Sequence, residues 1–242
     1  MRLKNLDILC STDDLRALPE GKLMINTINA YSYVTARNDS DFADALTGAG
    51  ALLPDGVGVV WGCRLIGAKC RPKERITGWD LFHYEMERLN ARGGSCFFMG
   101  TSEKTLGMVR DRAADEYPNI RVHTYSPPYK DVFSDDDNDR IVKAVNAVRP
   151  DLLWIGMSAP KQEKWLMQNF SRLDIAGHAG CIGAVFSFFA GTEKRAPKAW
   201  QQLGLEWFYR LIHDPRRLWR RYIIGNLRFS CYLLGEFISK QH

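Results

Sequence analysis

Short apolar runs alternate with helical patterns from residue 22 to residue 184, and this alternation restricts the fold more than any other feature. Elements of these lengths in this order favour a parallel α/β sheet with helices on both faces. The predicted strands are 22–26, 51–53, 95–99, 120–125, 151–156 and a last one within 175–184. The predicted helices are 30–47, 57–66, 77–89, 103–117, 135–148 and one that begins at Pro160.

The stretch from Ala51 to Val60 joins a short buried strand to a helix. Pro54 ends the strand because it cannot donate to a sheet ladder, and Gly56 allows the backbone to turn sharply. Asp55 therefore lies at a strand-to-helix turn, where open α/β sheets place ligands. A carboxylate at this point suits a general base and equally suits a cap of the following helix. Position alone leaves both roles open.

Polar residues also follow the other predicted strands. The carboxyl ends of parallel strands meet at one crevice, so these side chains are expected to lie together. Helix starts after Gly100 and Ser158 add backbone N–H groups suited to a phosphate. Each residue taken singly is equally well explained as a cap or turn, but together they predict a site for a phosphorylated ligand. The residues are Thr27, Asn29, Asp55, Thr77, Thr101 and Gln162.

The end of the chain is basic. Residues 194–242 hold ten Lys or Arg against three Asp or Glu, whereas residues 1–193 hold 23 against 25. Asp214-Pro215 predicts the start of a long helix. At 100° per residue, one stripe holds Arg217, Arg220, Arg221 and Arg228. The opposite side holds Leu218, Trp219, Tyr222, Ile223, Phe229, Leu233 and Phe237. This pattern fits a membrane-surface helix or a helix packed on the body with solvated arginines, and we favour the membrane surface.

Several classes of protein are disfavoured. No apolar stretch reaches the roughly 18 residues that cross a bilayer, and the first residues lack the apolar segment of a signal peptide. The six cysteines are scattered, as expected of reduced thiols in the cytoplasm. Neither G-x-G-x-x-G after a strand nor G-x-S-x-G occurs, which argues against a dinucleotide dehydrogenase and an α/β-hydrolase.

No metal site is predicted. The acidic run 135–139 resembles the start of a calcium loop, but Arg140 and Asn146 occupy the positions that require Gly and Glu. An acid-rich helix start is the better interpretation. The five histidines (His83, His123, His178, His213 and His242) form no ligand pair at helical spacing.

Several ordered motifs taken together resemble the WecG/TagA/CpsF family of bacterial glycosyltransferases over nearly the whole chain. These are Thr27-x-Asn29, Pro54-Asp55-Gly56-Val57-Gly58, Arg75-Ile76-Thr77-Gly78, Pro160-Lys161-Gln162-Glu163, the run 191–197, the run 204–211, Asp214-Pro215-Arg216-Arg217-Leu218 and Arg220-Arg221-Tyr222. Two positions depart from the family pattern on the expected donor side, namely Phe186-Ser187-Phe188 and Pro127-Pro128-Tyr129.

The resemblance implies a Rossmann-like core, residues 1–194, and a membrane-associating appendage, residues 195–242. It implies inverting transfer of a sugar, often of N-acetylmannosamine type, from a UDP-sugar to a polyprenyl-diphosphate-linked sugar in cell-surface polysaccharide synthesis. Carried over by motif, Asp55 is the base on the acceptor hydroxyl and Thr27, Asn29 and Gln162 line the pocket. The appendage supplies Arg210, Arg217 and Arg220 to a diphosphate.

The resemblance further implies that neither metal nor cofactor is needed. The enzyme is expected on the inner face of the cytoplasmic membrane as a peripheral protein that does not bind nucleic acid, and a homo-oligomer is compatible with this expectation. The alternative is that the protein is not an enzyme but an anion-binding module whose basic tail binds nucleic acid or anionic lipid. The aromatic side chains of the tail favour lipid over nucleic acid.

Overall fold

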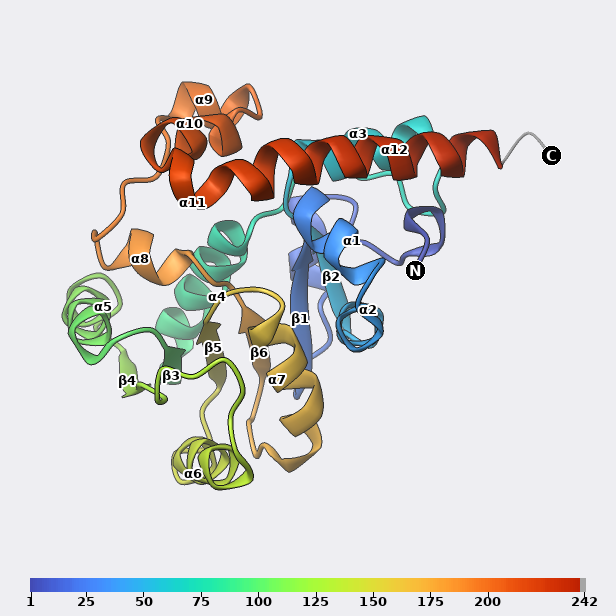
Figure 1. Cartoon of the computed structure of the whole chain (residues 1–242). Helices are drawn as coiled ribbons and strands as arrows, with labels where there is room; N and C mark the ends of the chain where they lie inside the picture. The colour runs from blue at the N-terminus through green and yellow to red at the C-terminus, as the bar shows by residue number, and fades with distance from the viewer. Residues whose placement is uncertain (240–242) are drawn as a thin grey trace.

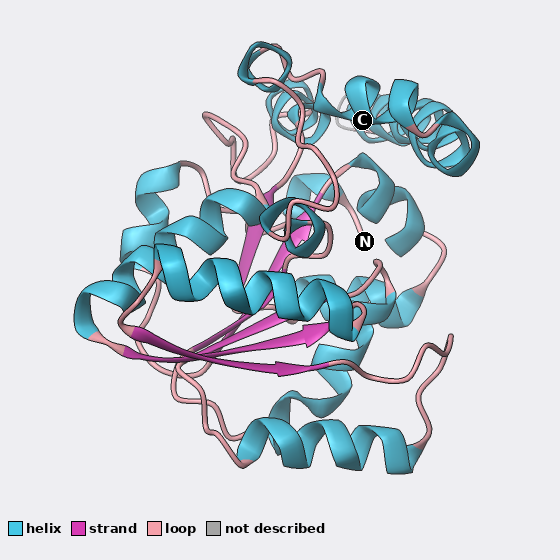
Figure 2. Cartoon of the chain, turned by 90° about the vertical axis from the view of Figure 1, so that its left-hand side faces the viewer, coloured by secondary structure: helices cyan, strands magenta, loops and turns pink. Residues whose placement is uncertain are grey.

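Residues 1–239 are described in a computed structural model, and within them six strands form one parallel sheet in the order β2-β1-β6-β5-β3-β4. The predicted α/β fold is confirmed, with helices on both faces of the sheet (Figure 2). The strands are β1 (Leu23–Ile28), β2 (Ala51–Pro54), β3 (Gly94–Gly100), β4 (Ile120–Tyr125), β5 (Leu152–Gly156) and β6 (His178–Cys181). Residues 240–242 of the predicted appendage, His242 among them, lie outside the described residues.

The helices that connect the strands are α1 (Ala30–Ala36), α2 (Ser40–Thr47), α3 (Val57–Leu65), α4 (Gly78–Arg92), α5 (Glu103–Glu116), α6 (Asp135–Asn146), α7 (Lys161–Asn169) and α8 (Val185–Phe189). The single helix predicted over 30–47 is wrong, because Asp39 interrupts it and caps α2 through the backbone N–H of Phe42. The acidic run opens α6 as predicted, with Ser134 and Asp137 forming a capping box.

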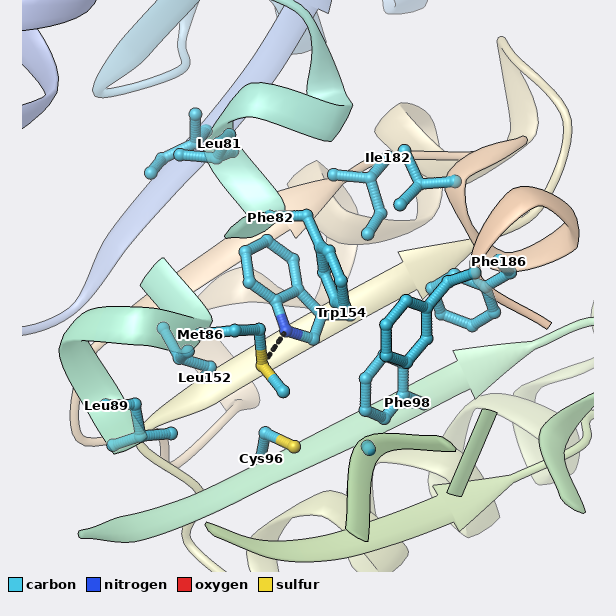
Figure 3. Close-up of a cluster of buried hydrophobic side chains, with 14 of the residues drawn as sticks. Leu81, Phe82, Met86, Leu89, Cys96, Phe98, Leu152, Trp154, Ile182 and Phe186 are labelled. Carbon is cyan, nitrogen blue, oxygen red and sulfur yellow. Dashed lines mark hydrogen bonds between the residues drawn. The ribbon is translucent and has the colours of Figure 1, made fainter. Parts of the chain in front are cut away.

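One apolar cluster shows how the sheet positions its helices (Figure 3). Trp154 of β5 is fully buried against Phe82 of α4, with ring centroids 5.5 Å apart, and its indole N–H donates to Met86 Sδ at 3.4 Å. Phe98 of β3 contacts Phe186 of α8 edge to face at 5.3 Å. These contacts fix the first turns of α4 and α8 beside the carboxyl ends of the strands.

The C-terminal region forms a separate layer along one end of the sheet (Figure 1). It comprises α9 (Lys198–Gln202), α10 (Glu206–His213) and a continuous helix made of α11 (Pro215–Trp219), a π-helical turn (Arg220–Ile224) and α12 (Gly225–Ile238). The predicted start is confirmed, since Asp214 caps α11 by accepting from the backbone N–H of Arg217.

Buried contacts hold α12 on the core. The Glu236 carboxylate accepts hydrogen bonds from the backbone N–H groups of Leu3 at 3.0 Å and Lys4 at 3.1 Å, and from the Tyr33 hydroxyl. A Cβ added to Gly62 of α3 would lie 3.1 Å from Leu233 of α12, so the two helices approach closely because that position is glycine. Figure 1 shows the same pair of helices side by side.

The single apolar side predicted for this helix is wrong. Leu218, Phe229 and Leu233 are buried against the rest of the protein, but Trp219 and Ile223 are exposed. The outward apolar residues are Trp219, Ile223, Leu227, Leu234 and Ile238. The helix therefore carries two apolar faces, one packed on the core and one directed to the outside.

Candidate active site

A large cavity opens at the carboxyl ends of the strands. The chain passes from β3 through α5 to β4 and from β5 through α7 to β6, in opposite directions across the sheet. Such a reversal leaves a crevice beyond the strand ends. The cavity encloses about 1660 Å³ and is lined by these ends and by α3, α10 and the long C-terminal helix. The six polar residues predicted to converge, Thr27, Asn29, Asp55, Thr77, Thr101 and Gln162, all line it.

Some of these residues also have local roles. Asn29 caps α1 by accepting from the backbone N–H of Ser32 at 3.0 Å. Thr77 caps α4 and shares a capping box with Asp80. For these two positions the cap and the site are not alternatives, because a residue that caps a helix at a strand end also borders the crevice.

Asp55, by contrast, does not cap the helix that follows it. The N-cap of α3 is Gly56, and no side chain accepts a hydrogen bond there. The Asp55 backbone N–H donates to the Ile28 carbonyl at 2.8 Å, which ties the turn to the end of β1. Gly56 has φ of +148°, and a Cβ on it would lie 3.4 Å from the Cβ of Asn29. The helix-cap alternative is therefore wrong, and the carboxylate is left to line the cavity.

Burial raises the pKa of Asp55 to about 6, and the negative charge of Glu206 on α10 adds to the rise. Arg75 and Arg221 act in the opposite direction, and Asp80 adds a smaller rise. A carboxylate with a pKa this close to neutrality is a stronger base than an ordinary aspartate and is still ionised at pH 7.

A buried carboxylate joins the C-terminal layer to the core beside Asp55. Glu206 pairs with Arg75 at 3.1 Å and with Arg195 at 3.3 Å, and all three side chains are mostly buried. Sequence reasoning placed Arg75, Arg195 and Glu206 in motifs without giving any of them a role. Only the fold brings residues 75, 195 and 206 to one point.

The predicted arginines separate into two groups. Arg210 and Arg217 line the cavity, where Glu193 lies 3.9 Å and 3.5 Å from them. Arg220 does not line it, since its guanidinium lies 5.3 Å from the centre of the Trp219 ring. The neighbouring Arg221 lines the cavity instead.

The motif residue Gln162 is buried, and both ends of its side-chain amide form hydrogen bonds. Its Oε1 accepts from the Met157 backbone N–H at 3.2 Å, and its Nε2 donates to Glu163 Oε1 at 2.8 Å. Glu163 is itself buried, its Oε2 has no hydrogen-bond partner within residues 1–239, and burial raises its pKa to about 7. Sequence reasoning did not single out Glu163, although it adjoins Gln162 in the same motif.

Part of the cavity lining comes from the segments that follow β3 and β4. Thr101 has φ of 49°, an uncommon conformation for a β-branched residue and one found at functional sites. Its carbonyl accepts from Ser126 Oγ at 2.7 Å. Ser102 then caps α5. Lys161 lies on the same side, with Nζ 3.8 Å from the centre of the Phe133 ring.

Residues 1–239 contain no group of three or more His, Cys, Asp or Glu side chains arranged to hold a metal ion. The acidic Asp137 is engaged by Lys130 at 2.7 Å and by Arg140 at 2.6 Å. Over the same residues, no helix combines the length and apolar character needed to cross a membrane.

Comparison with known proteins agrees with the motifs. A model of the glycosyl transferase WecG/TagA/CpsF family matches residues 2–242. A Bacillus subtilis (strain 168) protein named N-acetylglucosaminyldiphosphoundecaprenol N-acetyl-beta-D-mannosaminyltransferase is 33% identical over 218 residues, which cover 90% of this chain and 81% of that protein. Proteins of the same name from Bacillus spizizenii (30% identical; 81% of this chain and 73% of the relative) and Staphylococcus aureus strain MW2 (27%; 82% and 75%) are also similar. The chain therefore belongs to the WecG/TagA/CpsF family of glycosyltransferases.

Proposed function

We propose that this glycosyltransferase moves an N-acetylmannosamine-type sugar from a UDP-sugar to a polyprenyl-diphosphate-linked sugar, with inversion and without a metal ion. The names of the relatives support the sugar and the lipid-linked acceptor. The observation that carries the proposal is Asp55, a partly buried carboxylate with a pKa of about 6 that lines a large cavity and caps no helix.

In the proposed reaction Asp55 accepts the proton of the acceptor hydroxyl. The acceptor oxygen then attacks the anomeric carbon as the bond from that carbon to the diphosphate breaks. The nucleoside diphosphate leaves with the electron pair, and attack from the opposite face inverts the configuration. Arg210 and Arg217 supply positive charge for the leaving diphosphate, which is the task that a metal ion performs in other enzymes.

Thr27, Asn29 and Gln162 are proposed to position the substrates around Asp55. The donor nucleotide is assigned to the half of the cavity over β3 and β4, where α5 begins. The two departures from the family pattern, at Ser187 and at Pro127-Pro128, line the cavity. They are therefore the first positions to exchange when donor preference is tested.

The acceptor lipid requires the enzyme to reach a membrane, and the outward face of the C-terminal helix suits this task. Trp219 and Ile223 are exposed there, and Trp61 of α3 is 69% exposed beside α12. Such side chains, together with nearby arginines, favour an anionic lipid surface. We propose peripheral attachment to the inner face of the cytoplasmic membrane through an appendage, residues 195–242, on a catalytic core, residues 1–194.

The test is a screen of UDP-sugars against a short-chain prenyl-diphosphate N-acetylglucosamine acceptor, with the product detected by mass. A disaccharide product formed from UDP-N-acetylmannosamine is expected. Asp55→Asn should bind UDP normally and turn over at least about 100-fold more slowly. Near-normal turnover of this variant would remove Asp55 from its role, and absence of product with every donor would reject the proposed reaction.

A further inference from the structure

We propose that Cys10 and Cys70 form a redox modification site, at which a peroxide converts the two thiols into a disulfide. The disulfide ties the N-terminal segment, residues 3–10, to the loop after α3, residues 67–74. Both cysteines are free thiols in the structure, and both are partly exposed. Neither of them lines the candidate active-site cavity, so the site is independent of the proposed function.

The two thiols are in direct contact although 60 residues separate them in the sequence. Cys10 Sγ lies 2.9 Å from Cys70 Sγ. A disulfide bond of about 2.05 Å therefore requires a further approach of less than about 1 Å. Cys70 Sγ also donates to the Ile8 carbonyl at 2.7 Å, which leaves the Cys10 thiol to donate to Cys70 Sγ. The two sulfur atoms are thus already directed toward each other.

Backbone hydrogen bonds hold the two segments together on either side of this contact. The Lys73 N–H donates to the Cys10 carbonyl at 2.7 Å, and the Lys69 N–H donates to the Lys4 carbonyl at 3.0 Å. A disulfide is strained when the backbone must move to form it. Because the main chain is already fixed beside both thiols, a small movement of the two side chains is enough to close the bond.

The surroundings of the two thiols set the order of the reaction. Hydrogen bonding to Cys70 and burial raise the pKa of Cys10 to about 11, so Cys10 stays protonated at neutral pH. Cys70 is flanked in the sequence by the cations Lys69 and Arg71 and is the first nucleophile.

The Cys70 thiolate attacks one oxygen of hydrogen peroxide and becomes a sulfenic acid, and the other oxygen leaves as water after taking up a proton. The Cys10 sulfur then attacks the Cys70 sulfur, and the Cys10 proton leaves with the hydroxyl group as a second water. Two thiols and one hydrogen peroxide thus give one disulfide and two water molecules. A dithiol reductant reverses the change by thiol–disulfide exchange.

The disulfide acts on the part of the core that holds the C-terminal layer. The backbone of Leu3, in the N-terminal segment, donates to Glu236 of α12, and Figure 1 shows this segment beside α12. The loop that contains Cys70 leads to Arg75, which pairs with Glu206 of α10. Oxidation therefore joins covalently the two segments from which these attachments to α12 and α10 are made.

Peptide mapping of the full chain tests the site. The reduced protein is treated with hydrogen peroxide, blocked with N-ethylmaleimide and digested with trypsin without reductant. The expected product is peptide 5–16 linked to peptide 70–73, lighter by two hydrogen atoms than the two thiol peptides together. Dithiothreitol should separate them. The matched control is Cys231→Ser, which removes an exposed thiol of α12 and should leave the yield of the link unchanged.

Single variants test the order of attack. In Cys10→Ser, Cys70 should still react with peroxide and stop at the sulfenic or sulfinic acid. In Cys70→Ser, Cys10 should react at least about tenfold more slowly than Cys70 does in Cys10→Ser. In the wild type, the link closes a loop of 60 residues in the unfolded chain. It should therefore raise the urea concentration at the unfolding midpoint by at least about 0.5 M, and dithiothreitol should reverse this rise.

Free Cys10 and Cys70 thiols after Cys231 has been fully oxidised would overturn the proposal, as would a link that forms only in urea. An oxidised protein that unfolds at the same or a lower urea concentration than the reduced protein would equally reject it, because the bond would then not fit the native fold. Equal peroxide reactivity of Cys10 and Cys70 in the single variants would reject the order of attack. The mapping uses the wild type, so its result does not depend on the folding of the variants.

Discussion

Replacement of Asp55 by asparagine should stabilise the protein while it lowers turnover at least about 100-fold. Folding raises the pKa of this carboxyl from 3.8 to about 6, mainly because the site is buried. Each tenfold change in proton affinity is worth about 1.4 kcal/mol, so ionised Asp55 costs the folded state about 3 kcal/mol at neutral pH. Asparagine has nearly the same shape and carries no charge, and Asp55→Asn should remove this cost.

The sign of the pH dependence follows from the same shift. Well below pH 4 the group is protonated in both the folded and the unfolded state, and the two proteins should be equally stable. As the pH rises from about 4 to about 6, the unfolded state loses its proton first, so wild-type stability falls. Above about pH 6 the advantage of Asp55→Asn should stay constant.

Urea unfolding followed by tryptophan fluorescence at intervals between pH 4.5 and 8 measures this difference. The exposed Asp13, whose side chain is 86% accessible, provides a control, and Asp13→Asn should alter stability little at any pH. Equal stability of Asp55→Asn and wild type at pH 7.5 would refute the reasoning. A difference that grows as the pH falls would do the same, because it would mean that the carboxylate is stabilised by folding.

Three further outcomes are expected. Glu236→Ala should lower the free energy of unfolding by about 3 kcal/mol or more in urea titrations, because three donors lose a charged acceptor. The control is Ser230→Ala, at an exposed position of the same helix, which should change the free energy of unfolding little. Similar losses in both variants would contradict the role of Glu236 in holding α12 on the core. The double change Trp219→Ser with Ile223→Ser should weaken sedimentation with anionic vesicles and leave turnover of a soluble acceptor intact, and unchanged sedimentation would remove this face from membrane binding. EDTA should leave the transfer rate nearly unchanged, and a large loss restored by magnesium would show that the arginines do not suffice.

Local chemistry was enough to predict much of the fold. β4 coincides with its predicted range, and the acidic run opens α6 as predicted. These features depend on side-chain periodicity and on hydrogen bonds between near neighbours, which act over a few residues. The convergence of Thr27, Asn29 and Asp55 was equally predictable, because parallel strands bring their carboxyl ends to one edge.

Long-range packing decided the rest. A helical wheel joins Phe229 and Trp219 into one apolar side, because it contains no information about what each contacts. The tertiary structure buries Phe229 and leaves Trp219 outside. The reason is that Glu236 of this helix accepts a hydrogen bond from the backbone of Leu3, which is 233 residues away in the sequence. The same docking turns Arg221 toward the crevice and Arg220 away from it. Which of two adjacent arginines lines the cavity is set by the rotation of a packed helix, and that rotation depends on contacts between residues far apart in the chain.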